Sequence, residues 1–227
     1  MASSSKGNCY LISDGVTTLL LDAGISLKAI QVGCGFNLGK IDACMITHQH
    51  KDHSKAAADL ARKGIDIYTG QETIEACGLS GHRIHPVKSL REVKVGSFQV
   101  LPFDLQHDVP NLGYVFTSEA TGEKLAYITD TGYIRFRFSA LDILMIECNY
   151  DTISLWDSVK VGDTPVEMVP RLARTHMNLD TLIEMLRAND LSRLRQIYLL
   201  HMSGRNADAE RIRETVQRAT GAEVYVG

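Results

Sequence analysis

The sequence lacks the features that mark secreted and membrane-spanning proteins. Its first residues, MASSSKGN, contain no positively charged segment followed by an apolar one, so they do not resemble a secretory signal peptide. No apolar run approaches the ~20 residues that a membrane-spanning helix needs. We therefore expect a protein of the cytoplasm without a membrane segment.

Cysteine pairs and an excess of positive charge are also missing. The cysteines are odd in number, five in all, and no two form a C-x-x-C pair, which argues against a disulfide framework and against a thiolate zinc site. The formal charge of −3 argues against a protein that coats nucleic acid without selection, since such domains are usually strongly basic. Formal charge omits bound metals, however, and two divalent cations would change the balance to +1 at one concentrated place.

Low-complexity segments, internal repeats and linkers rich in proline or glycine are absent as well. We therefore expect one domain spanning residues 1–227. Strand-like and helix-like segments alternate at both ends of the chain, with a block of consecutive strands between them, which predicts an α/β fold. The predicted strands are 9–13, 16–24, 41–47, 65–69, 95–105, 113–119, 124–130, 142–149, 195–201 and 222–227, and the predicted helices are 26–34, 54–64, 71–78, 178–190 and 206–221.

The stretch 150–177 is the least regular part of the chain. It contains the single tryptophan together with Gly162, Pro165 and Pro170, and it follows no clear period. We expect a loop that serves as a flap or lid over a site.

The most informative stretch is THQHKDHS, at positions 47–54, which holds three histidines and an aspartate within six positions: His48, His50, Asp52 and His53. The chance of H-x-H-x-D-H arising in a chain of this composition is on the order of 10⁻³. Neutral imidazoles are the commonest metal ligands, and a solvated polar loop has no need of them. The cluster directly follows an apolar strand, so the sequence predicts a metal site at a strand end.

Further ligands are needed because four donors are too few for two metals. His107, Asp130 and His201 each lie where a predicted strand gives way to a loop, the same position that the cluster occupies. Taken singly, each is more often a packed or hydrogen-bonded side chain, but their shared placement favours metal binding. His82 and His85 lie in a polar connection without strand context, and we do not assign them to the site.

These residues and several motifs resemble a known family. The order of Asp22, the four-residue cluster, His107, Asp130 and His201 resembles the metallo-β-lactamase fold, a four-layer αββα sandwich with a binuclear metal site at one edge of its two sheets. The resemblance covers essentially the whole chain. Within that superfamily, SSSKGNCYLI, LLLDAGISLKAI, YITDTGY, IECNYD, HMN and LLHMSGRNAD resemble the YycJ/WalJ-like branch, which is regarded as DNA exonuclease-like, and the last two motifs are also similar to ribonuclease Z.

The resemblance implies a role for each residue. One metal would be held by His48, His50 and His107, the other by Asp52, His53 and His201, and Asp130 would bridge the two. It also makes Asp22 a supporting residue behind the ligands, although an aspartate in a turn is an equally good account. Asp52 would also orient the nucleophile, a hydroxide bridging the metals. Zinc suits imidazole and carboxylate ligands, and manganese is the alternative.

His176 is our candidate for the proton donor to the leaving group. It lies just before Asn178, a plausible helix N-cap, so it would stand beside a helix N-terminus where anions bind favourably. The alternative is that His176 merely packs against the irregular stretch 150–177.

The sequence thus predicts a metal-dependent phosphodiesterase that hydrolyses nucleic acid, DNA rather than RNA, as an exonuclease. No insertion resembles the tRNA-gripping arm of ribonuclease Z, and the length leaves no room for the cap domain of β-CASP nucleases, which weakens a specific tRNA or mRNA role. Two alternatives stay open: a hydrolase of small esters, thioesters or cyclic phosphodiesters with the same fold, and a metal-binding protein without turnover.

Overall fold

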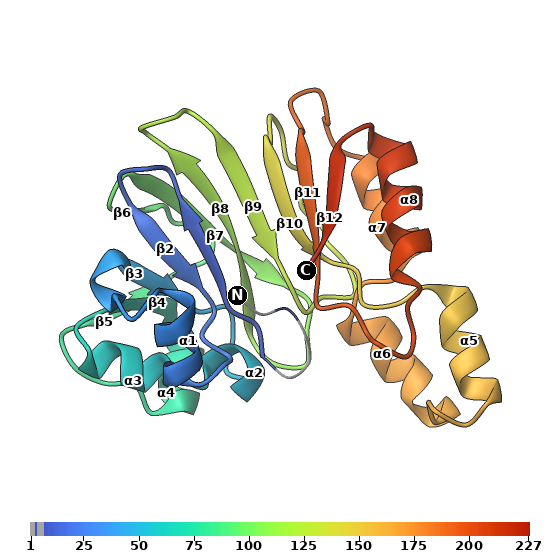
Figure 1. Cartoon of the computed structure of the whole chain (residues 1–227), viewed down its shortest axis with the longest axis horizontal. Coiled ribbons are helices and arrows are strands. Elements are labelled where there is room, and N and C mark those ends of the chain that lie inside the picture. The colour runs from blue at the N-terminus through green and yellow to red at the C-terminus, as the bar shows by residue number, and fades with distance from the viewer. Residues whose placement is uncertain (1–2, 4–6) are drawn as a thin grey trace. The chain divides into compact units, whose positions relative to one another are not determined.

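The computed structural model describes Ser3 and residues 7–227, and the chain divides into two compact units. Figure 1 shows the elements of unit 1 mainly in blue to green and those of unit 2 mainly in yellow to red. That residues 1–227 form a single domain stays a prediction. Unit 1 comprises the described residues up to Asp104 together with Val109–Gly122, and unit 2 comprises Leu105–Asp108 together with Glu123–Gly227.

Unit 1 contains a five-stranded sheet. Its first two strands form the predicted antiparallel hairpin, and the following neighbours in the sheet are parallel. Parallel pairing brings the carboxyl ends of β2, β3 and β4 to the same edge, where functional side chains can gather. In sheet order the strands are β1 (Tyr10–Ser13), β2 (Thr18–Leu21), β3 (Ala43–Met45), β4 (Asp66–Gly70) and β5 (Ile84–Val87).

Helices of unit 1 complete its hydrophobic core. Ser26 caps the first helix as predicted, because its side chain accepts a hydrogen bond from the Ala29 amide at 3.2 Å. Apolar side chains of these helices, such as Ile30 and Leu60, pack with Cys44 and Ile67 of the sheet. The helical elements are α1 (Leu27–Gly33), η1 (Leu38–Lys40), α2 (Lys51–Ser54), α3 (Ala57–Arg62) and α4 (Gln71–Cys77).

Three more strands belong mainly to unit 1: β6 (Val93–Val95), β7 (Phe98–Leu105) and β8 (Asn111–Ser118). β6 pairs antiparallel with β7, and β8 is the other neighbour of β7. The sequence predicts β7 and β8 but not the short strands β5 and β6. His85 lies on β5, so the prediction that it lacks strand context is wrong. Its Nε2 lies 3.1 Å from a carboxylate oxygen of Asp66 on the neighbouring strand β4, a contact between the two strands.

Unit 2 contains four strands that are parallel to their neighbours, as the alternation of strands and helices predicts. Helix α7 packs against α8, and α8 packs against the last strand. Figure 1 shows α7 and α8 beside β12. The elements are β9 (Lys124–Ile128), β10 (Ile143–Glu147), β11 (Gln196–Leu200) and β12 (Glu223–Val226), in the sheet order β12-β11-β10-β9, with α7 (Leu179–Arg187) and α8 (Ala209–Thr220).

The stretch 150–177 is helical, so the prediction of an irregular loop is wrong. It forms α5 (Thr152–Lys160), η2 (Val166–Met168) and α6 (Val169–Thr175). Asp151 caps α5 by accepting a hydrogen bond from the Ser154 amide at 2.9 Å. Exposed apolar side chains such as Ile153 and Trp156 hide the helical period in the sequence.

None of the helices in the described part of the chain combines the length and the apolar character that crossing a bilayer requires.

Candidate metal centre

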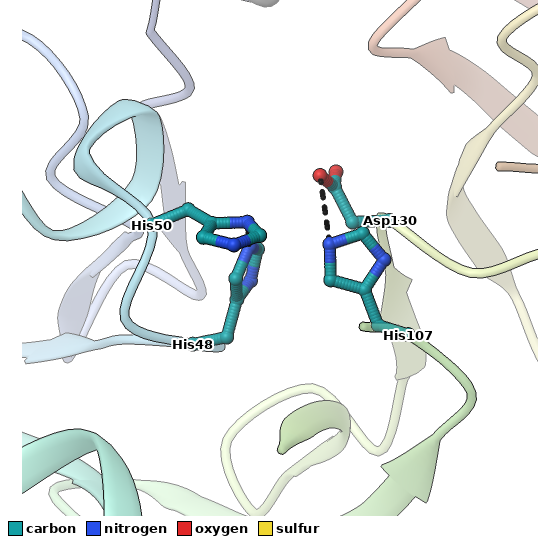
Figure 2. A group of neighbouring side chains, drawn as sticks. All are labelled: His48, His50, His107 and Asp130. Carbon is teal, nitrogen blue, oxygen red and sulfur yellow. Dashed lines mark hydrogen bonds and ion pairs between the residues drawn. The ribbon is translucent and has the colours of Figure 1, made fainter. Parts of the chain in front are cut away.

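The cluster His48, His50, Asp52 and His53 gathers in unit 1, where His48 and His50 follow β3 and where Asp52 and His53 lie on helix α2. His48 and His53 are fully buried, and their ring centroids lie 4.3 Å apart. The Nε2 atom of His48 lies 3.1 Å from Nδ1 of His50, and the two rings are drawn in Figure 2. A carboxylate oxygen of Asp52 lies 3.5 Å from His53 Nε2. Unit 1 therefore brings all four predicted residues of the motif together.

Asp22, which directly follows β2, organises this cluster. Its carboxylate is fully buried, and it accepts a hydrogen bond from the Thr47 amide at 2.8 Å. Its other oxygen lies 2.7 Å from Nδ1 of His53. A histidine whose Nδ1–H is held by a carboxylate presents Nε2 as the metal-binding atom. Nε2 of His53 lies 3.0 Å from the side-chain nitrogen of Asn8.

The backbone of the segment Asp22-Ala23-Gly24 clamps the histidine turn. The Ala23 amide donates a hydrogen bond to the His53 carbonyl at 2.7 Å. A Cβ placed on Gly24 would lie 1.6 Å from the carbonyl oxygen of Asp52, so only glycine fits here. The motif DAG is therefore explained by close packing against the turn that carries the ligands. Of the resembling motif SSSKGNCYLI, residues 4–6 lie outside the described residues.

Unit 2 holds a second cluster at the carboxyl ends of its adjacent parallel strands. Asp130 follows β9, Glu147 ends β10 and His201 follows β11. The candidate ligand atoms of Asp130, Glu147, His176 and His201 lie within 4.8 Å of one another. The Nε2 atom of His107 lies 3.8 Å from a carboxylate oxygen of Asp130, and Figure 2 marks this pair with a dashed line. Unit 2 therefore brings together His107, Asp130 and His201, which the sequence groups by their shared position at strand ends.

Glu147, which the sequence patterns did not single out as a site residue, organises this cluster. Its carboxylate is fully buried and lies 2.7 Å from Nδ1 of His176 and 2.8 Å from Nδ1 of His201. It also accepts hydrogen bonds from the amides of Thr131 and Met177 at 3.1 Å and 3.0 Å. Burial alone would raise the pKa of Glu147, but the charge of His176 and the hydrogen bonds from both histidines lower it. A lone glutamate closing the apolar run ILMIE was the available signal.

His176 caps the end of α6 and is turned toward Glu147. Burial alone would lower the pKa of His176, but the charge of Glu147 and the hydrogen bond to it raise that pKa above its ordinary value. Asn178 is the N-cap of α7 as predicted, because its side chain accepts a hydrogen bond from the Asp180 amide at 2.6 Å. The nearby Thr175 carbonyl lies 3.1 Å from Nδ1 of His107 and fixes that ring.

Strained backbone occurs in both clusters, although Phe36, Leu90 and Ala140 elsewhere in the described chain also have positive φ. Asp22, Asp130 and His201 have φ values of 55°, 51° and 52°, in the left-handed region that non-glycine residues seldom adopt. Each is the first or second residue after a strand, where the chain turns sharply. Such strain persists only where surrounding contacts hold it, and it is typical of functional sites.

The donor chemistry of both clusters fits divalent cations. The clusters offer imidazole nitrogens and carboxylate oxygens, the ligands that zinc and manganese take in proteins. Each of His53, His107 and His201 has its Nδ1 atom within hydrogen-bond distance of a carboxylate or a carbonyl oxygen. This arrangement leaves Nε2 for a metal and is the usual support of metal-binding histidines.

A fold with two such clusters defines a class of hydrolases. The family model described as the beta-lactamase superfamily domain matches residues 17–202, and this chain belongs to that superfamily. It is similar to a protein of Bacillus anthracis named exodeoxyribonuclease YycJ, with 30% identity over 96% of this chain and 86% of the relative. A weaker similarity, 25% identity over 55% of this chain and 47% of the relative, links it to ribonuclease Z of Methanopyrus kandleri.

A solved structure has a fold similar to that of this chain. The metallo-β-lactamase fold protein YhfI of Bacillus subtilis superposes with a TM-score of 0.76 at 19% identity, covering 100% of this chain and 91% of that one. The predicted fold class and the resemblance to the YycJ/WalJ-like branch are thereby confirmed: a mixed α/β fold with two sheets flanked by helices. The chain belongs to a family of metallo-hydrolases, enzymes that typically bind two divalent metals.

Proposed function

We propose that this protein is a metal-dependent phosphodiesterase of the cytoplasm that degrades DNA from its ends. The observation that carries the proposal is the donor set: seven histidine and aspartate side chains in two clusters, with a buried carboxylate behind the histidines of each. The similarity to a relative named exodeoxyribonuclease supports the choice of substrate.

We assign the ligands as the family pattern implies. His48, His50 and His107 would hold one cation, Asp52, His53 and His201 would hold the other, and Asp130 would be a ligand of both. We take zinc as the native metal and manganese as the alternative. When bound, two such cations would neutralise charge on the phosphate and lower the pKa of water to about 7.

The chain's own residues supply orientation and a proton. The carboxylate of Asp52, about a quarter exposed at 27%, accepts a hydrogen bond from the attacking water and orients it toward phosphorus. His176 donates a proton to the departing sugar oxygen, which would otherwise leave as an alkoxide. Glu147 holds Nδ1 of His176, so Nε2 carries the proton to be donated, and its negative charge stabilises the imidazolium.

The proposal is tested with end-labelled single-stranded and double-stranded DNA and RNA, in Zn²⁺ and in Mn²⁺. Oligonucleotides blocked at the 5′ or 3′ end report the polarity of digestion. We expect stepwise shortening of DNA from one end, prevented by a chelator and restored by added metal. Faster digestion of RNA would move the assignment to a ribonuclease. Survival of every polymer with every metal, alongside turnover of a small ester, would replace it with a small-molecule hydrolase.

A further inference from the structure

Two exposed side chains of unit 2 lie on segments that carry candidate site residues. Tyr133 follows Asp130 by three positions and is 57% exposed. Arg174 precedes His176 by two positions, in the last turn of α6, and is exposed as well. A solvent-exposed aromatic ring and a solvent-exposed guanidinium group thus lie within three residues of the buried cluster of unit 2.

The two segments touch through their backbones. A Cβ placed on Gly132 would lie 2.7 Å from the carbonyl oxygen of Arg174 and 2.9 Å from that of Ala173. Next to this contact, the hydroxyl of Thr131 donates a hydrogen bond to the Tyr133 carbonyl at 2.8 Å. Tyr133 and Arg174 therefore project from adjoining backbone that packing holds in place, and they do not belong to independent loops.

Arg174 differs from several other arginines of unit 2. Within the described part of the chain, its guanidinium makes no hydrogen bond and no ion pair. An arginine without a protein partner is available for a phosphate, because the N–H donors of its planar guanidinium can bind two phosphate oxygens at once. The arginines with protein partners are Arg137 with the Ala188 carbonyl, Arg171 with Asp108, Arg193 with Asp142 and Arg195 with Glu123.

We infer that Tyr133 and Arg174 form a subsite for an unpaired nucleotide of the substrate strand. Tyr133 stacks on the base, and Arg174 binds a phosphate next to that nucleotide. The inference rests on the proposed nuclease function and makes it more specific: the substrate is a single-stranded end, because a base stacked inside a duplex cannot cover the tyrosine ring. Stacking accepts every base, so the subsite confers no sequence preference.

The expected contributions of the stacking contact and of the phosphate contact determine which quantities to measure. Stacking of one base on an aromatic ring is worth enough to change oligonucleotide affinity by about tenfold when the ring is removed. One arginine–phosphate contact on a single strand changes the slope of log affinity against log salt by about 0.7. A small phosphodiester that carries no base reaches the reacting atoms without either contact.

The test uses the full metal-loaded chain with labelled single-stranded oligonucleotides. The variants are Tyr133→Ala, Tyr133→Phe and Arg174→Ala. Their matched controls are Tyr225→Ala, on an exposed tyrosine of β12, and Arg187→Ala, on an exposed arginine in the last turn of α7. Methyl p-nitrophenyl phosphate is the small substrate. A set of oligonucleotides with one abasic residue, moved stepwise inward from the digested end, locates the stacked base.

We expect Tyr133→Ala to raise the KM for oligonucleotides about tenfold, while Tyr133→Phe and both controls stay within about twofold of the parent. An abasic residue at one position of the oligonucleotide should raise the KM of the parent enzyme and should not change the KM of Tyr133→Ala. Arg174→Ala should lower the salt slope by about 0.7, and hydrolysis of methyl p-nitrophenyl phosphate should not change in any variant.

Two failures are distinguishable. If the parent enzyme shortens polynucleotides but an abasic residue at every position affects it and Tyr133→Ala equally, the subsite is wrong and the nuclease function stands. If the parent enzyme hydrolyses methyl p-nitrophenyl phosphate but no polynucleotide, the proposed function is wrong and the subsite falls with it.

Discussion

The two clusters position their histidines in different ways. In unit 1 the candidate ligands are neighbours in the sequence, His48 to His53, on one turn of chain. In unit 2 they come from separate strand ends and span His107 to His201. A local cluster needs little help to assemble, whereas a dispersed one depends on the whole fold of its unit.

Their supporting carboxylates differ accordingly. Asp22 holds a single histidine, His53, and ties the motif to the end of β2 through Thr47. Glu147 holds His176 and His201 at once, and backbone amides fix its position. We therefore expect the loss of Asp22 to affect one metal only, and the loss of Glu147 to affect both metal binding at His201 and proton donation by His176.

The largest effect is expected from Asp130→Ala. Asp130 is the proposed bridge, so its loss should remove most of both cations and reduce activity by more than about a thousandfold, whereas His48→Ala should lower metal content by about one equivalent. Metal analysis of dialysed protein gives the stoichiometry, and His82→Ala serves as the control that keeps full content. Equal metal content in Asp130→Ala and the parent protein would show that Asp130 is not a ligand.

The next largest effect distinguishes the two carboxylates. Glu147→Gln should lower kcat by about a thousandfold, since losing one such support typically costs about 10- to 100-fold and Glu147 supports two histidines. Asp22→Asn should weaken the affinity for one metal by about 10- to 100-fold, with kcat recovering at high metal concentration. Titration with Zn²⁺ while recording rates separates the two cases. If excess metal rescued both variants equally, Glu147 would be only a ligand support.

The difference between the clusters also explains what the sequence could predict. The unit 1 cluster is visible because its spacing is improbable in a chain of this composition. His107, Asp130 and His201 could be found only through their shared position at strand ends. The signal for Glu147 was weaker, because a single glutamate at the end of an apolar run also fits a surface carboxylate, and only the folded structure shows that it is buried against two histidines.

The secondary-structure elements likewise differ in how clearly the sequence indicates them. Segments with a clear apolar period, such as α7 and β10, were predicted to within a few residues. Strands β5 and β6 are short and interrupted by polar residues, so they carry little periodicity. The stretch 150–177 was missed because α5 exposes apolar residues that a helix usually buries, which leaves no amphipathic pattern to detect.

A smaller effect is expected from His176→Ala. As a proton donor, His176 should contribute about a hundredfold to kcat for nucleic acid, whose leaving group is an alkoxide. Its removal should leave metal content unchanged and should scarcely affect methyl p-nitrophenyl phosphate, because p-nitrophenolate leaves without a proton. Rates on both substrates and metal analysis of the same preparation provide the check. Loss of metal in this variant would make His176 a ligand.

The smallest effect should come from Asp14, a carboxylate of unit 1 outside its cluster. Burial alone would raise the pKa of Asp14, but hydrogen bonds from the hydroxyls of Ser97 and Ser118 and from the amides of Thr17 and Val16 lower it. A carboxyl whose pKa is lower in the folded state contributes stability above its unfolded pKa of about 3.9, and this contribution is lost as the pH falls through the folded pKa.

Asp14→Asn should therefore destabilise the protein by about 1 kcal/mol at pH 7, a value reduced by solvent screening, and the difference from the parent should shrink below about pH 4. Urea unfolding in EDTA at several pH values measures it without a contribution from metal release. Asp157→Asn, which breaks only an exposed pair with Lys160, is the control and should change stability by less than about 0.5 kcal/mol. Metal content and kcat should stay unchanged in Asp14→Asn, because a local cluster needs only its own turn and Asp22 to hold its shape. A loss of metal on this substitution would mean that the histidine motif depends on unit 1 as a whole, and the contrast with unit 2 would fail.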